Sequence, residues 1–222
     1  MQTKLKIDFV SDVACPWCAV GLGNLTQAIA TINDKESIEL HFQPFELNPT
    51  MPLGGQDAME HLTQKYGLSE AQVSSNQANI RAKAKEVGFE FHPDGRKRVY
   101  NTFNCHRLLY WALQAYGPAA QYRLKRELLR AYFEDVSNMD EAETLLCAVD
   151  RSELDRAKAL EIINSKLYEN EVKLLETHYT DEGISAVPAV ILNDQYLISG
   201  AQPIEVYQEA IAQALSEASP SE

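Results

Sequence analysis

Two cysteines separated by two residues, Cys15 and Cys18, lie where a predicted strand gives way to a predicted helix. Residues 5–10 alternate apolar and polar side chains, as a strand does. Residues 19–32 place apolar side chains at helical spacing. Pro16 suits the first helical turn, where its missing N–H would have had no partner. Cys15 is therefore expected at the start of the helix.

This position favours thiol chemistry. Unpaired backbone N–H groups and the positive end of the helix dipole stabilise a thiolate and lower its pKa. Cys18 lies about one turn further on, within reach of Cys15 for a disulfide. Cys15 is thus the candidate nucleophile toward a substrate disulfide, and Cys18 the thiol that resolves the mixed disulfide.

A structural zinc site is the alternative for this pair of cysteines. Such a site needs two further ligands at suitable spacing. Cys105 and Cys147 are far apart in the sequence and belong to no second pair of this kind. A redox role is favoured, and no bound metal is expected.

The composition limits the kinds of partner that the chain is expected to bind. A chain of 222 residues with 45% hydrophobic and 23% charged residues is typical of a soluble globular protein. The net charge of −12 and the lack of a basic stripe argue against nucleic acid and against an anionic membrane surface as partners. No signal peptide or membrane helix is evident, and four cysteines are too few for a disulfide scaffold, so we expect a cytoplasmic protein.

The organisation of the chain predicts a mixed sheet built from its two ends. A strand over 38–42 follows the first helix and suggests a right-handed βαβ unit. Near the other end, 189–192 and 196–198 form a predicted hairpin, followed by a last helix that opens at Pro203. We expect an α/β fold with one discontinuous domain, 1–50 and 166–222, interrupted by an inserted helical domain, 51–165.

Four segments of the sequence together resemble the DsbA-like family, and within it the FrnE-like branch, which is related to the 2-hydroxychromene-2-carboxylate isomerases. The segments are residues 8–18, 45–49, 187–188 and 199–203. The resemblance implies a thioredoxin fold with a large helical insertion. It also implies a thiol–disulfide oxidoreductase that reduces, forms or isomerises disulfides in proteins, peptides or small thiols.

The resemblance assigns roles to matching positions. Cys15 would be the nucleophile, Cys18 the resolving thiol and Pro188 a cis-proline facing them, with Pro16 and Trp17 supporting the pair. The backbone of Val187 would then be free to pair with an extended substrate. No cofactor beyond the redox-active cysteines is expected, and glutathione is a candidate co-substrate.

Five further residues are candidates for the substrate groove. Glu46 and Asn48 follow the second strand, near the sheet end where such folds place sites; they could accept the proton of Cys18, or simply form a turn. His106 is either a polar wall of the groove or a solvated helix start. The full set of candidates is Asp12, Glu46, Asn48, Asn101 and His106.

Departures from the family pattern matter too. Trp17 stands where DsbA has a histidine whose charge helps to hold the thiolate, so we expect a milder oxidant than DsbA. The isomerase relatives have serine at the nucleophile position, and Cys15 argues against a simple transfer of their activity. A glutathione-dependent isomerase of an aromatic or polyketide-like molecule stays the alternative function.

Cys105 and Cys147 both fit apolar helical stripes. We expect both to be buried as small apolar side chains. The alternative is a second redox pair, which requires the two Cβ atoms to lie within about 4.5 Å of each other.

Overall fold

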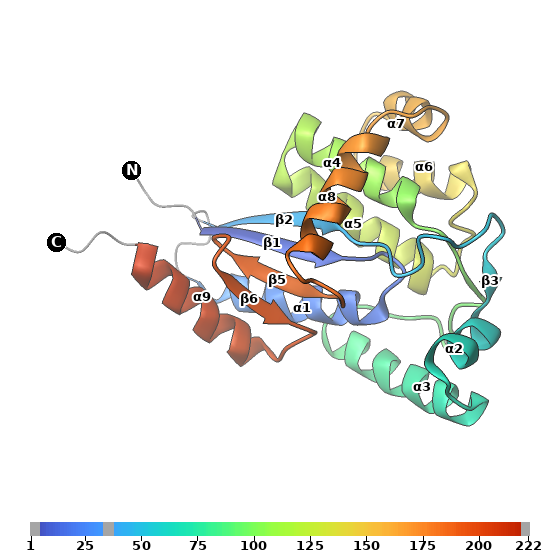
Figure 1. Cartoon of the computed structure of the whole chain (residues 1–222), viewed down its shortest axis with the longest axis horizontal. Helices are drawn as coiled ribbons and strands as arrows, with labels where there is room; N and C mark the ends of the chain where they lie inside the picture. The colour runs from blue at the N-terminus through green and yellow to red at the C-terminus, as the bar shows by residue number, and fades with distance from the viewer. Residues whose placement is uncertain (1–4, 33–37, 219–222) are drawn as a thin grey trace.

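A four-stranded mixed sheet forms the centre of the computed structural model, which describes residues 5–32 and 38–218 (Figure 1). The ends of the predicted domain, 1–4 and 219–222, lie outside the described residues. The strand order is β2-β1-β5-β6; β1 pairs with β2 in parallel, and the β1–β5 and β5–β6 pairs are antiparallel. The strands are β1 (Leu5–Ser11), β2 (Ile38–Pro44), β5 (Ala189–Leu192) and β6 (Tyr196–Ser199). The two ends of the chain thus share one sheet, as predicted.

Strand β1 is the buried centre of this sheet. Leu5, Ile7 and Phe9 on one face have no exposed surface, and Asp8 and Val10 on the other face are at most 1% exposed, which fits a strand paired on both edges and covered on both faces. The Phe9 ring packs edge-on against Phe42 of β2, with 5.8 Å between ring centroids. This packing fixes the end of β1, from which the chain turns directly into the first helix.

Three helices belong to the terminal parts of the chain. Helix α1 packs against α9, and α8 packs against β2. Gly23 permits the close approach of α1 to the end of α3, because a Cβ atom there would lie 2.5 Å from Cβ of Val87. The three helices are α1 (Pro16–Ala30), α8 (Glu169–Asp181) and α9 (Ile204–Ala218).

The segment 51–165 supplies two groups of helices, which lie on opposite sides of the end of the sheet where α1 begins (Figure 1). In the first group α3 packs against α1, and a short ladder joins β3 to β4. In the second group α4 and α5 pack against β2. The first group is β3 (Gln56–Asp57), α2 (Ala58–Tyr66), α3 (Glu70–Glu86) and β4 (Arg98–Val99); the second is α4 (Phe103–Tyr116), α5 (Pro118–Phe133), α6 (Ala142–Arg151) and α7 (Arg156–Ile163).

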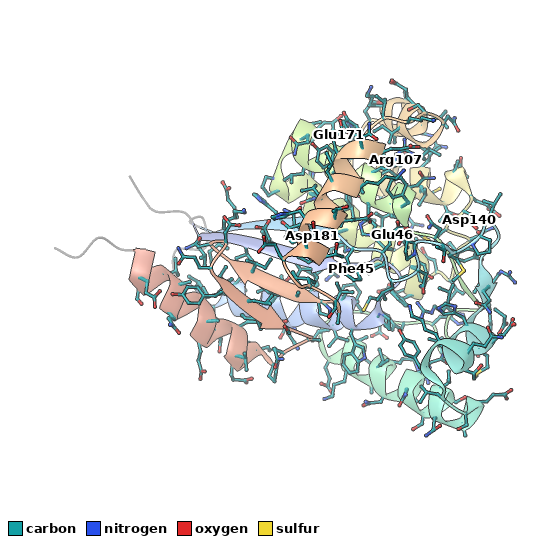
Figure 2. All side chains as sticks on the ribbon, viewed as in Figure 1. Phe45, Glu46, Arg107, Asp140, Glu171 and Asp181 are labelled. Carbon is teal, nitrogen blue, oxygen red and sulfur yellow. The ribbon has the colours of Figure 1, made fainter. Side chains whose placement is uncertain are left out.

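Arg107 ties the second group together (Figure 2). Its buried guanidinium donates to the carbonyl oxygens of Ile162, Ser165 and Leu167, at 2.5–2.8 Å. These carbonyls belong to the last turn of α7 and to the segment that follows it. Arg107 is therefore a structural residue.

None of the described helices combines the length and apolar character needed to cross a membrane.

Candidate active site

Cys15 caps the N-terminus of α1. Its backbone is extended, with φ −93° and ψ 112°, and Pro16 occupies the first helical turn. The N–H of Cys15 donates to the Asp12 carbonyl at 3.2 Å, and the N–H of Cys18 donates to the Cys15 carbonyl at 3.1 Å. The short connection from β1 therefore holds Cys15 at the positive end of the helix, as the spacing of the motif predicts.

The two thiols are not equivalent in position. Cys15 keeps 5% of its surface exposed, whereas Cys18 has none. Both are free thiols in the structure. Cys15 Sγ lies 3.6 Å from the Val187 carbonyl oxygen, and the Val187–Pro188 peptide bond is cis. Cys15 is thus the more accessible of the two thiols and lies beside the main chain of Val187.

The two thiols also differ in acidity. The hydrogen bond from Cys18, together with the backbone N–H groups of Cys18 and Trp17, lowers the pKa of Cys15 against the opposing effects of burial and of the Asp12 charge. Burial, followed by the interaction with Cys15, raises the pKa of Cys18 well above its ordinary value. Cys15 is the better thiolate, and Cys18 must lose its proton before it can attack.

Asp12 lies beneath Cys15 and is completely buried. Its Oδ1 accepts the N–H of Ala14 at 3.0 Å and the hydroxyl of Thr102 at 2.7 Å, and its Oδ2 accepts the N–H of Leu47 at 2.7 Å. Burial acts to raise the pKa of Asp12, but His106 and the N–H groups of Ala14 and Leu47 outweigh it, so the pKa is lowered. The carboxylate joins the turn before α1, the end of β2 and the start of α4.

The position of His106 differs from the prediction of a groove wall or a solvated helix start. Its side chain is only 2% exposed, so it is not a solvated helix start, and it does not line the cavity beside Cys15. Its Nε2 lies 3.6 Å from Asp12 Oδ1, longer than a hydrogen bond. The Thr102 hydroxyl draws the start of α4 onto Asp12 and carries His106 inward. Burial lowers the pKa of His106 despite the opposing charge of Asp12, which favours a neutral ring.

Of the other groove candidates, Glu46 (Figure 2) and Asn48 follow the end of β2, and Asn101 precedes α4. Glu46 Oε1 accepts the Asn101 amide at 2.9 Å, and Asn48 Oδ1 accepts Lys65 Nζ at 2.7 Å. Burial, then the charge of Asp12, raises the pKa of Glu46 to about 7, although Asn101 opposes the shift. Glu46 is therefore a carboxyl group that changes charge near neutral pH.

A cavity of about 760 Å³ opens beside Cys15, Trp17 and Val187. Glu46 and Asn48 line it, whereas Asp12 and Asn101 do not: Asn101 donates to Glu46, and Asp12 accepts from Thr102. Its apolar lining is Phe45, Leu47, Leu62, Leu68, Val73, Ile80, Phe91 and Phe133. Its charged lining is Lys65, Arg81, Arg96 and Glu46. The cavity is thus apolar with a local excess of positive charge, in a chain of net charge −12.

Known proteins share this architecture. A family model described as a DSBA-like thioredoxin domain matches residues 6–212. The chain belongs to this family. The structure is similar to a probable DsbA oxidoreductase from Streptomyces coelicolor, with 30% identity, a TM-score of 0.89, and coverage of 98% of this chain and 93% of that one. No functionally curated protein matches the sequence.

Two more distant structures resemble this DsbA-like protein in fold. The cytosolic disulfide reductase DsbM from Pseudomonas aeruginosa has 13% identity and a TM-score of 0.66, covering 95% of this chain and 99% of that one. A 2-hydroxychromene-2-carboxylate isomerase has 13% identity and a TM-score of 0.69, covering 96% and 97%. The α/β thioredoxin-like fold with a helical insertion is confirmed, and the protein is an enzyme of the thiol–disulfide oxidoreductase class.

The remaining cysteines of the DsbA-like chain behave differently from each other. Cys105 is 1% exposed, and burial, with the Asp12 charge, strongly raises its pKa. Cys147 is exposed, which contradicts the prediction of a buried side chain. The core side of α6 is formed by Leu145, Leu146 and Val149, and Cys147 instead lies 3.7 Å from Glu143 on the outer side. Both are free thiols. They lie on separate helices, and no residue is among the described contacts of both.

Sequence reasoning missed the basic residues near the site, among them Lys125 and Arg96. Lys125 of α5 is completely buried, with Nζ 5.8 Å from the centroid of the Phe42 ring. Its position on the apolar stripe, four residues after Gln121 and three before Leu128, was the available signal. Arg96 lies in a loop without periodicity; its Nη1 donates to the Ala14 carbonyl at 2.5 Å.

A metal site requires several ligand side chains close together. Among the residues that the structure describes, no group of three or more His, Cys, Asp or Glu side chains could hold a metal ion. The alternative of a zinc half-site at Cys15 and Cys18 therefore gains no ligands from the described part of the chain.

Proposed function

We propose that Cys15 and Cys18 form a redox-active pair that exchanges disulfides with a protein, peptide or small-thiol substrate. The Cys15 thiolate attacks one sulfur of a substrate disulfide and releases the other as a thiolate. Cys18 then attacks Sγ of the mixed disulfide at Cys15, which forms the Cys15–Cys18 disulfide and releases the second substrate thiol. The substrate gains two electrons and two protons, and the pair loses them. The reverse sequence oxidises a substrate dithiol.

The difference between the two thiols in exposure and in pKa supports this proposal. A partly accessible thiol of lowered pKa at a helix N-terminus sits directly in front of a buried thiol of raised pKa. A nucleophile needs the first set of properties, and a resolving thiol protected from outside reagents needs the second.

The cavity supports a small-thiol substrate as well as a peptide. The carbonyl of Val187 lies 3.6 Å from Cys15 Sγ, where an extended chain could pair with it. The basic residues Lys65, Arg81 and Arg96 suit an acidic thiol compound such as glutathione. DsbM, whose structure was determined with glutathione and which is described as cytosolic, provides the analogy for this substrate and for a cytoplasmic location.

The reduction potential of the pair tests the proposal. Protein carrying Cys147→Ser, which removes the exposed thiol, is equilibrated with glutathione buffers and the disulfide is quantified. We expect a potential below the value of about −120 mV that is typical of DsbA, because Trp17 supplies no cation to the thiolate. Failure to form any intramolecular disulfide would overturn the proposal.

Single substitutions separate the two roles. In the Cys147→Ser background, Cys18→Ser should accumulate a stable mixed disulfide at Cys15, since nothing resolves it, and Cys15→Ser should form none. Mass spectrometry of the intact protein reads out both results.

The apolar cavity beside Cys15 favours one alternative, a glutathione-dependent isomerase of an aromatic molecule. Such an enzyme needs no resolving thiol. Conversion of 2-hydroxychromene-2-carboxylate that persists in Cys18→Ser would support the isomerase, whereas conversion absent from the wild type would exclude this substrate.

A further inference from the structure

Arg96 places a cation at the wall of the cavity beside Cys15. Its Nη1 donates to the carbonyl oxygen of Ala14 at 2.5 Å. Its Cζ lies 5.5 Å from the centroid of the Tyr132 ring and 5.5 Å from that of the Phe133 ring. The hydrogen bond and the two aromatic rings hold the planar guanidinium in one position. A ligand that binds Arg96 therefore costs little further ordering of this side chain.

Most of the hydrogen-bonding capacity of Arg96 is unused. A guanidinium has several N–H donors, and the described residues provide Arg96 with one acceptor, the Ala14 carbonyl, and with no ion pair. Glu46 is the acidic residue among those that line the cavity, and it accepts from Asn101 instead. The remaining donors suit a carboxylate, which a guanidinium can bind through two parallel hydrogen bonds.

A second cation, Arg81, lies on the same wall. Arg81 and Gln77 are four residues apart on α3, so they share one face of the helix, and both line the cavity. This face meets the loop that holds Arg96, because a Cβ atom at Gly95 would lie 3.5 Å from Gln77 Oε1. Arg81 is half-buried and has no hydrogen-bond or ion-pair partner among the described residues. The wall thus carries two available cations in a chain of net charge −12.

Arg96 is close to the reacting sulfur because Ala14 directly precedes Cys15. Covalent geometry keeps the Ala14 carbonyl oxygen within about 6 Å of Cys15 Sγ. Arg96 Nη1 therefore lies no more than about 9 Å from this sulfur. A new disulfide bond spans about 2 Å, and a carboxylate on a two-carbon arm extends about 5 Å beyond the substrate sulfur. Such a carboxylate can reach Arg96 while the sulfurs exchange.

We propose that Arg96, with Arg81 beside it, binds the carboxylate of a small acidic disulfide during attack by Cys15. The inference rests on the disulfide exchange proposed above and narrows its substrates to thiols that carry a carboxylate a few bonds from sulfur. The Cys15 thiolate forms a bond to one substrate sulfur, the substrate S–S bond breaks, and the other sulfur leaves as a thiolate. Arg96 holds the half that becomes attached to Cys15.

A series of small disulfides that differ in their terminal group tests the proposal. Dithiodipropionate is an anion, hydroxyethyl disulfide is neutral and cystamine is a cation. The parent protein carries Cys18→Ser and Cys147→Ser, so the mixed disulfide at Cys15 accumulates and mass spectrometry quantifies it. Each rate is divided by that of the same disulfide with 2-mercaptoethanol. We expect the anion to react about tenfold faster than the neutral disulfide at low salt, although the net charge of −12 would favour the cation.

Substitutions assign the preference to the wall. Arg96→Met should reduce the ratio of the anionic to the neutral rate to about one. Arg96→Lys keeps the charge but not the planar fork, so it should keep part of the preference. Arg81→Met should lower the ratio to a smaller extent. Lys97→Met, at an exposed residue next to Arg96, controls for the loss of one positive charge and should leave the ratio unchanged.

The outcomes separate this inference from the proposed function. Equal rates for the anionic and neutral disulfides in the parent would overturn the inference, and this measurement does not depend on the folding of an Arg96 variant. An equal slowing of all the disulfides in Arg96→Met would also overturn it, because Arg96 would then only support the turn before Cys15. A preference that survives Arg96→Met would do the same. No mixed disulfide with any of the probes in the parent would overturn the proposed function itself.

Discussion

Asp12 and Glu46 are two carboxyl groups close to the same nucleophile, and their pKa values are shifted in opposite directions from the ordinary values. Asp12 is completely buried, yet its pKa is lowered. Glu46 is only partly buried and lines the cavity, yet its pKa is raised to about 7. Burial by itself would predict the reverse order.

The surroundings of each carboxyl group explain the difference. Against the effect of burial, His106 and then the N–H groups of Ala14 and Leu47 lower the pKa of Asp12, and the Thr102 hydroxyl also donates to this carboxylate. Glu46 has the Asn101 amide as its side-chain partner and also faces the negative charge of Asp12. One carboxylate is therefore a permanent structural anion, and its charge helps to keep the other protonated.

The largest effect should come from Asp12→Asn. The amide nitrogen would face one of the donors that now bind the carboxylate and leave it unpaired in the core. We expect the free energy of unfolding to fall by about 2–4 kcal/mol, measured by urea denaturation. Asp181→Asn, at an exposed residue near the end of α8 (Figure 2), is the control and should change stability by less than about 0.5 kcal/mol.

The Asp12→Asn variant should also change how the free energy of unfolding depends on pH in the acid range. Because the folded-state pKa of Asp12 is depressed, its contribution is present above its ordinary value of 3.8 and is lost as the pH falls through the depressed value. Asp12→Asn should lack that loss. A stability cost no larger than that of Asp181→Asn would show that the three donors do not stabilise the fold.

A smaller effect of opposite sign should come from Glu46→Gln. The raised pKa means that the folded state carries no penalty at Glu46 below its ordinary pKa of 4.5, and a full penalty above about 7. The amide keeps an oxygen for Asn101 and never ionises. We expect the variant to be more stable than the parent by about 1–3 kcal/mol at about pH 8, after allowance for solvent screening, with little gain at about pH 4.

Urea unfolding at the two pH values measures this difference. Glu209→Gln, at an exposed glutamate of α9, controls for the loss of one negative charge from an acidic chain. A gain of the same size at both pH values would mean that ionisation of Glu46 is not the cause.

The sequence sufficed for the fold because its signals are periodic. Alternation predicted β1, helical spacing predicted α1, and the hairpin of β5 and β6 was marked by its turn. The two-residue strands β3 and β4 escaped because they are too short to have a period. Cys147 was misjudged because successive residues of a helix are rotated by about 100°, which places Cys147 on the outer side although Leu146 and Ala148 on either side of it are buried.

The residues of the site also differ in how well the sequence predicts their positions. The positions of Cys15 and Cys18 followed from local rules about helix starts. The burial of His106 depends on long-range packing of α4 against the sheet, which no local pattern encodes, whereas the position of Lys125 on the apolar stripe of α5 could have been noticed. The opposite shifts of Asp12 and Glu46 depend on donors from separate parts of the chain, so residue type alone could not separate them.

The smallest predicted effect concerns Glu176 of α8, a third carboxyl group near the pair. Burial, then the charges of Glu46 and Asp12, raises the pKa of Glu176 to about 8, and its Oε1 has no described hydrogen-bond partner. Glu46→Gln should lower this pKa without restoring the ordinary value of 4.5, because burial and Asp12 persist. The change should correspond to less than about 1 kcal/mol. Carbon NMR titration of the glutamate carboxyl groups measures it, with Glu209→Gln as the control. An unchanged titration of Glu176 would show that the two glutamates ionise independently, and that Asp12 acts on each of them separately.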